Sequence, residues 1–128
     1  MPAPDYDPRY LEGIEHFNQC DFYEAHEVWE ELWADYQGPS RKFYQGLIQV
    51  AVCLHHFGNE NTRGAVKLYH SSRSYLEPYR PVHEGLDVEK LFRDLEACCR
   101  SILESTEPFP TAKIVGDLVP EIHLIDAE

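Results

Sequence analysis

The stretch from Asp21 to Tyr36 constrains the fold of this chain more than any other part of the sequence. It reads DFYEAHEVWEELWADY and contains no Gly or Pro, which is typical of an uninterrupted α-helix. Asp21, in the capping position, is followed three residues later by Glu24, which is the spacing of a capping box. Placing successive residues 100° apart puts two tryptophans on one face, and we expect that face to pack against the protein interior.

Two polar side chains share this tryptophan face. On a helical wheel His26 and Glu30 fall beside the two tryptophans. Buried polar groups destabilise a protein unless they are paired. We therefore expect some other group to satisfy His26 and Glu30, and the nature of that group decides the functional interpretation.

Four further helices are predicted from amphipathic spacing and from capping or helix-breaking residues. They begin at about Pro8 and span about 40–57, 62–79 and 87–105. The helix over 40–57 is apolar nearly all round, so we expect it to have neighbours on most sides. Three prolines after residue 106 forbid a long helix there, although many of the side chains are apolar.

The predicted fold class is therefore all-α. A compact bundle of about five helices occupies residues 8–105, with helix 40–57 at its centre, and residues 1–7 form a loose arm. The tail, 106–128, packs across this bundle or onto a second subunit, and the second alternative predicts a homodimer. We expect the whole chain, 1–128, to form a single domain.

The charge balance narrows the class of function. The chain has 23 Asp and Glu residues against 11 Lys and Arg, a formal net charge of −12. This argues against binding to nucleic acid, which usually needs a basic patch, and against docking on an anionic membrane. No apolar run is long enough to cross a bilayer, and the N-terminus lacks the features of a signal peptide. We expect a cytoplasmic protein.

The third predicted helix carries a polar stripe of its own. Gln45, Gln49 and His56 fall within about 40° of one another on its helical wheel. The short connection at residues 38–40 makes this helix an antiparallel neighbour of the helix before it. Since His26 begins one helix and His56 ends the other, we expect both histidines at the same end of the bundle.

One hypothesis is a binding or catalytic site between these two helices. The candidates for acid–base chemistry or for a divalent transition metal are His26, Glu27, Glu30 and His56, with His26, Glu30 and His56 as the metal ligands. The candidates for orienting a small polar ligand are Arg41, Gln45 and Gln49. Neither an HExxH motif nor a Glu-x-x-His pair is present, so the sequence predicts a site without naming a reaction.

The alternative is a structural or interaction module. In this hypothesis His26 holds Glu30 within its helix or Gln49 across the helix pair, and the polar stripe only fixes how the helices pack. The tryptophans are then core anchors, and function lies on another surface such as the tail.

Three segments carry a more specific pattern. They are FNQCDFYEAHEVWEELW at 17–33, RKFYQGLIQVAVCLHH at 41–56, and the start of the fourth helix at 61–65. The first has an HExxW-like helix after an Asn-containing turn, and the second has an arginine before a QGLIQ helix that ends in histidine. This combination resembles the bacterial and archaeal proteins grouped as domain of unknown function 309.

The resemblance implies a compact all-helical fold and a shared set of polar residues, but it implies no activity. That set is Asn18, His26, Glu27, Trp29, Glu30, Trp33, Arg41, Gln45, Gln49 and His56. Through it, Asn18 joins the predicted ligand-binding residues. One departure is His55, which stands before His56 where the family has an aromatic or apolar residue. The sequence leaves open which of the two histidines occupies the inner stripe.

Overall fold

The structure is a computed structural model, and it describes residues 6–107 and 110–125. The α-helices are α1 (Pro8–Asn18), α2 (Phe22–Asp35), α3 (Arg41–Gly58), α4 (Thr62–Leu76) and α5 (Val88–Leu103). Two short strands, β1 (Val82–His83) and β2 (Leu86–Asp87), form an antiparallel hairpin. Two 3-10 turns are η1 (Glu77–Tyr79) and η2 (Gly116–Leu118). The all-α prediction is confirmed.

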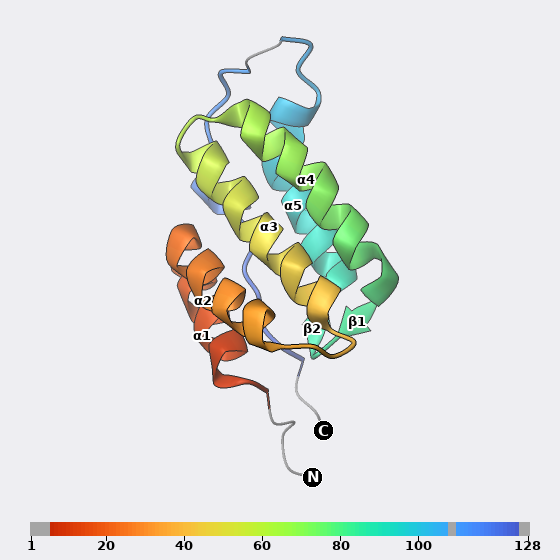
Figure 1. Ribbon diagram of the computed structural model, residues 1–128. Helices are drawn as coiled ribbons and strands as arrows, with labels where there is room; N and C mark the ends of the chain where they lie inside the picture. The colour runs from red at the N-terminus through yellow and green to blue at the C-terminus, as the bar shows by residue number, and fades with distance from the viewer. Residues whose placement is uncertain (1–5, 108–109, 126–128) are drawn as a thin grey trace.

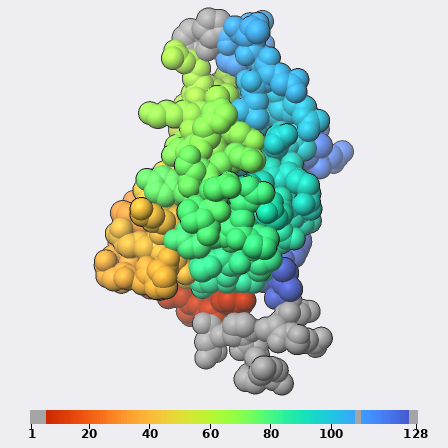
Figure 2. All heavy atoms as spheres, turned by 90° about the vertical axis from the view of Figure 1, so that its right-hand side faces the viewer, coloured from red at the N-terminus to blue at the C-terminus, as the bar shows by residue number. Residues whose placement is uncertain are grey.

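The helix α3 is central, as predicted. It packs against α2 on one side and α4 on the other, while α1 lies behind α2 and α5 beside α4 (Figure 1). Seen from the side, α4 and α5 lie next to each other and cover one face of the molecule (Figure 2). Within the described part of the chain, no helix is long and apolar enough to span a membrane.

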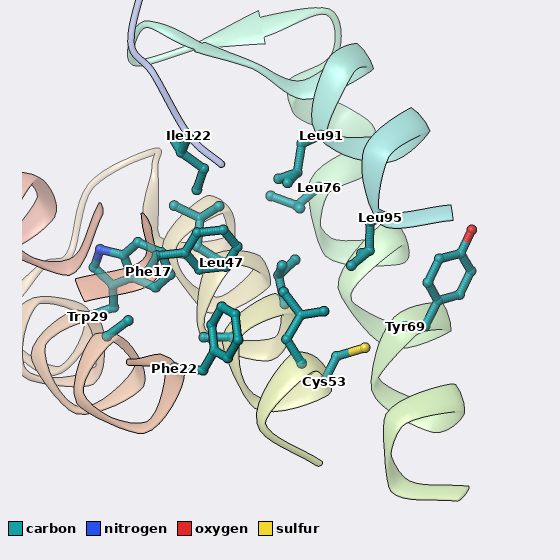
Figure 3. Packing of buried hydrophobic residues seen from close by; sticks show 14 of the residues in the cluster. Phe17, Phe22, Trp29, Leu47, Cys53, Tyr69, Leu76, Leu91, Leu95 and Ile122 are labelled. Atoms are coloured by element: carbon teal, nitrogen blue, oxygen red, sulfur yellow. The ribbon is translucent and has the colours of Figure 1, made fainter. Parts of the chain in front are cut away.

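One hydrophobic cluster joins all five helices, and its members point into the space around α3 (Figure 3). Trp29 of α2 is completely buried, and its indole Nε1 donates to the carbonyl oxygen of Tyr10 at 3.2 Å. The indole also lies against Gly13 of α1, where a Cβ would stand 2.0 Å from Trp29 Nε1. A glycine at this position is therefore what lets α1 and α2 approach so closely.

Residues of the capping type stand before α2, α3, α4 and α5, and those before α4 and α5 make the cap bond. Asn61 accepts from the backbone N–H of Gly64 at 3.1 Å, and Asp87 accepts from that of Lys90 at 3.0 Å. The capping box predicted at Asp21 is wrong, because its side chain makes no cap bond and instead stands 3.9 Å from a ring nitrogen of His16. Ser40 does not cap α3 either.

The fourth helix is shorter than predicted, and a hairpin follows it. The α-helix ends at Leu76 and tightens into η1, which contains Pro78. Glu84 and Gly85 form the turn of the β1–β2 hairpin and have φ of 46° and 74°. Strands of two residues are too short to leave any alternation in the sequence.

The tail packs on its own bundle, which is the first of the two predicted alternatives. It returns along the bundle from the far end of α5 toward the hairpin (Figure 1), and Ile122 is only 4% exposed. Of the predicted loose arm, residues 1–5 lie outside the described residues, as do residues 108–109 and 126–128 of the tail. Tyr6 packs edge-on against the ring of Tyr10, with centroids 5.5 Å apart.

Candidate functional site

The polar residues of α3 lie in the seam between α2 and α4. Arg41 places its guanidinium 3.9 Å from the ring centroid of Trp33 on α2. Gln45 donates through Nε2 to the hydroxyl of Tyr75 on α4 at 3.2 Å. The stripe therefore touches both neighbours of α3. We call Arg41, Gln45, Gln49 and His56 the polar seam, and all four are half-buried.

Gln49 carries a side-chain oxygen that has no partner. Its Oε1 is buried and accepts no hydrogen bond from the residues that the structure describes. The indole Nε1 of Trp33, beside Arg41, is likewise buried and donates to none of them. Buried polar atoms without a partner are uncommon in proteins, and a bound molecule is one of the usual reasons. The seam thus offers one acceptor and one donor that the protein itself does not use.

His26 and Glu30 pair with each other on α2. Nε2 of His26 lies 2.9 Å from Oε2 of Glu30, and Nδ1 lies 3.3 Å from the carbonyl oxygen of Tyr23. Both ring nitrogens therefore face oxygen acceptors on their own helix. The two side chains line an open hollow of about 460 Å³ together with Tyr23, Glu27, Glu31 and Ala34.

The expected burial of this pair is wrong. The side chain of His26 is 23% exposed and that of Glu30 is 57% exposed. The buried arc of α2 is centred on Ala25, Trp29 and Leu32, so His26 stands at its edge and Glu30 lies beyond it. The predicted buried face was centred on both tryptophans. Trp33 is only half-buried, so the buried face in the structure is centred farther from Glu30.

His26 and His56 lie at the same end of the bundle, as the antiparallel arrangement predicts, and His55 lies there too. The ring of Tyr23 stands 5.4 Å from that of His26 and 5.6 Å from that of His55. His55 is therefore the histidine of α3 that faces α2. His56 lies 6.1 Å from His55 and contacts Asn61 at 3.4 Å. Burial, and then the neighbouring His55, lower the pKa of His56 below its ordinary value.

The predicted metal ligands do not form a cluster. Over residues 6–107 and 110–125, no three His, Cys, Asp or Glu side chains are grouped so as to hold a metal ion. His26 and Glu30 are together, but His56 has its contact at the start of α4 instead. Glu27 is exposed and only lines the hollow.

Asn18 is the one predicted ligand residue that lies away from the seam. Its side-chain amide donates to the carbonyl oxygen of Ile122 at 2.8 Å and accepts from the N–H of Ile122 at 2.7 Å. Its side chain therefore holds the tail of the same chain, a contact that the sequence did not predict.

A second polar cluster was missed because its members are far apart in the sequence. Ser40 Oγ lies 2.7 Å from Nε2 of His83, and the His83 ring stands between those of Phe43 and Tyr79 at 4.7 and 4.6 Å. Burial lowers the pKa of His83, although the nearby Glu84 opposes that shift. No motif relates residue 40 to residue 83, and only the hairpin brings them together.

Comparison with known proteins matches part of this chain to a known family. Residues 10–68 match the model of the family described as "Domain of unknown function (DUF309)". The resemblance predicted from the sequence is thereby confirmed over this segment. The matched segment runs from α1 into α4, so it includes the whole polar seam and Asn18.

Two curated relatives extend the comparison. "Uncharacterized protein YpuF" of Bacillus subtilis (strain 168) is 33% identical over 101 residues, which make up 76% of this chain and 58% of the relative. An "Uncharacterized protein" of Aquifex aeolicus (strain VF5) is 38% identical over 53 residues, which make up 41% of this chain and 16% of the relative. The chain thus spans 58% or less of the length of these relatives, and neither name states an activity.

Proposed function

We propose that a small polar ligand binds at the polar seam through Gln49, Arg41 and Trp33. The observation that carries this proposal is the buried Oε1 of Gln49, which lacks a hydrogen-bond partner within the described residues. A buried acceptor left in this state destabilises a protein by about 1–3 kcal/mol. A ligand that donates an N–H or O–H to Gln49 removes this penalty and gains affinity from doing so.

Two other groups along the seam, Trp33 and Arg41, favour a ligand that carries both donors and acceptors. Trp33 Nε1 is an unused donor and needs an acceptor. Arg41 donates through Nε to the carbonyl oxygen of Tyr36 at 3.1 Å, and its guanidinium lies over the Trp33 ring. A guanidinium fixed in this way is suited to a carboxylate or amide oxygen. Amino acids and carboxamides combine these features.

The hollow on α2 is a second candidate site, with fewer observations to support it. His26 and Glu30 are the candidates for acid–base chemistry or for a divalent metal, and the hollow that they line is open to solvent. A metal bound there needs ligands beyond this pair, from solvent or from the ligand itself. We therefore rank metal binding below the binding of a polar organic molecule.

The structural alternative is favoured by two contacts. Gln45 bonds to Tyr75 across α3 and α4, and His26 bonds to Glu30 within α2. Both are satisfied pairs of the kind that fixes helix packing. This alternative explains Gln45 and His26, but it does not explain why Gln49 is left without a partner.

The experiment is an NMR titration of the ¹⁵N-labelled chain with glutamine, asparagine and acetamide. We expect at least one probe to shift the backbone signals of α3 and of the Trp33 indole. Gln49→Leu should abolish these shifts. Gln45→Leu is the matched control, four residues away on the same seam, and should retain binding. If no probe shifts the seam signals, or if Gln49→Leu responds as the wild type does, the proposed site is wrong.

We also propose that the protein acts in the cytoplasm. A net charge of −12 supports a role without nucleic acid or anionic membranes. The four cysteines are free thiols, and Cys53, Cys98 and Cys99 are buried, which suits the reducing cytoplasm.

A further inference from the structure

The hydroxyl of Ser40 and the imidazole of His83 have the geometry of a nucleophile and its base. Oγ of Ser40 lies 2.7 Å from Nε2 of His83, a distance at which a proton can pass between them. The Ser40 side chain makes no other hydrogen bond among the described residues, so its O–H donates to Nε2. Burial lowers the pKa of His83, and the ring is therefore neutral at pH 7 and able to take that proton.

Two aromatic side chains hold the base in place. The rings of Phe43 and Tyr79 stand 4.7 and 4.6 Å from the His83 ring. The hydroxyl of Tyr79 also donates to the carbonyl oxygen of Pro39 at 2.8 Å, which ties it to the residue before Ser40. These contacts fix the imidazole relative to the hydroxyl, and a reaction that depends on proton transfer needs such positioning.

The start of α3 offers hydrogen-bond donors beside Ser40. Ser40 stands in the capping position of this 18-residue helix, but its side chain makes no cap bond. The backbone N–H groups of Lys42 and Phe43, which usually donate to a capping oxygen, have no partner among the described residues. Such groups point out of the helix end and can donate to an oxygen that becomes negative next to Oγ.

A carboxylate stands beside the base. Oε2 of Glu84 lies 4.0 Å from Nε2 of His83 and is buried without a hydrogen-bond partner in the described part of the chain. Glu84 has a φ of 46°, which is uncommon for a residue other than glycine, and its carbonyl oxygen accepts from the hydroxyl of Tyr10 at 2.9 Å. The fold thus keeps a negative charge where it favours the protonated form of His83.

We propose that Ser40 and His83 form a catalytic pair that transfers the acyl group of a small carboxylic ester. Ser40 is the nucleophile and His83 is the general base, while Glu84 is a positioning residue whose charge stabilises protonated His83. Ser40 is only 5% exposed, whereas the side chains of His83 and Glu84 are 28% and 23% exposed. The substrate therefore approaches past these two side chains, and its acyl group must be small. This inference does not depend on a ligand in the polar seam.

The reaction has two halves. In the first, Oγ of Ser40 bonds to the carbonyl carbon of the ester, the ester C–O bond breaks, and the Oγ proton passes through Nε2 of His83 to the departing alcohol oxygen. In the second, the oxygen of a water molecule bonds to the acyl carbon and displaces Oγ, while a proton of that water passes through Nε2 back to Oγ. The products are an alcohol and a carboxylic acid, and both side chains are restored.

The test incubates the full chain with p-nitrophenyl acetate and locates acetyl groups by mass spectrometry. We expect an acetyl group on Ser40, none at this position in Ser40→Ala, and one again in Ser40→Cys. His83→Gln keeps a side chain that can bond to Ser40 but cannot take its proton, and acetylation should be about 100-fold slower or more. Ser72→Ala is the matched control and should react as the wild type does, because Ser72 is also buried but donates to the carbonyl oxygen of Tyr69 at 2.9 Å.

The dependence of the acetylation rate on pH tests the role of Glu84. The described residues that contact the His83 ring are Ser40, Phe43, Tyr79 and Glu84, and of these only Glu84 carries a charge. Glu84→Gln should therefore lower the pH at which the rate is half-maximal, and an unchanged value removes Glu84 from the proposal. Circular dichroism checks that each variant is folded. If wild-type Ser40 gains no acetyl group, or if folded His83→Gln gains it as fast as the wild type, the catalytic pair is wrong.

Discussion

At the scale of single residues, two glutamines one helical turn apart on the seam have different surroundings. Gln45 has a partner on α4, and Gln49 has a buried oxygen with none among the described residues. The sequence placed both on one stripe, but it had no means of telling them apart. Periodicity reports the face on which a side chain lies, whereas a hydrogen bond depends on which atom of the neighbouring helix lies within about 3 Å.

The closest helix contact rests on one glycine. In Gly13→Ala the added methyl group would stand 2.0 Å from Trp29 Nε1, so α1 and α2 must move apart or the indole must turn. We expect the free energy of unfolding to fall by about 1–3 kcal/mol, the usual effect of overpacking. Urea denaturation measures it.

Gly58→Ala is the matched control for this change, because a Cβ there meets nothing within 4 Å. Its free energy of unfolding should stay within about 1 kcal/mol of the wild-type value. Equal losses in the two variants would contradict the packing explanation for Gly13.

At the scale of elements, the sequence predicted the helices well and their ends less well. The amphipathic pattern located the five helices of the described chain, because a repeating apolar face is a local signal. Asp21 and Ser40 have the residue types of caps, yet their side chains face His16 and His83. A side chain of the capping type can bond either to the backbone of its own helix or to a residue elsewhere in the fold. The sequence around it does not show that second residue.

Capping variants test this distinction. Asn61→Ala removes the 3.1 Å bond to the Gly64 N–H and should lower the free energy of unfolding by about 0.5–2 kcal/mol. Asp21→Ala removes no cap bond and should change it by less than about 0.5 kcal/mol. Thermal denaturation of the two variants side by side decides the matter, and a larger loss in Asp21→Ala would refute this assignment of caps.

At the scale of the whole molecule, contacts between distant segments fix the positions of the tail and of the hairpin, which the sequence did not predict. The tail returns to Asn18, and the hairpin carries His83 to Ser40. Both contacts join segments more than forty residues apart, and no short motif encodes them. The polar seam was predictable because α2 and α3 are joined by a short connection, and the contact between Asn18 and the tail was not.

Two half-buried histidines make stability depend on pH. Burial lowers the pKa of His56 and of His83 below 6.5, so the unfolded chain binds more protons than the folded chain as the pH falls through that value. The free energy of unfolding should therefore decrease between roughly pH 7 and pH 5. Urea denaturation across this range measures it, and His83→Gln should flatten the curve. An increase in stability over the same interval would contradict the assigned burial.

We expect the chain to be a single domain, which should unfold as one unit. The hydrophobic cluster joins all five helices and Ile122 of the tail, so loss of any helix exposes part of the shared core. We expect tryptophan fluorescence and circular dichroism to give the same midpoint in urea. Two separated transitions would show that the chain divides into smaller cooperative units.

The most direct test of the binding-site account is the free energy of unfolding of Gln49→Leu, measured without ligand beside Gln45→Leu. If the Gln49 amide is kept for a ligand, its removal should leave stability unchanged or raise it by up to about 3 kcal/mol. Gln45→Leu should lower it by about 0.5–1.5 kcal/mol, because the bond to Tyr75 is lost. If Gln49→Leu is destabilised as much as Gln45→Leu, the seam is a structural network and not a binding site.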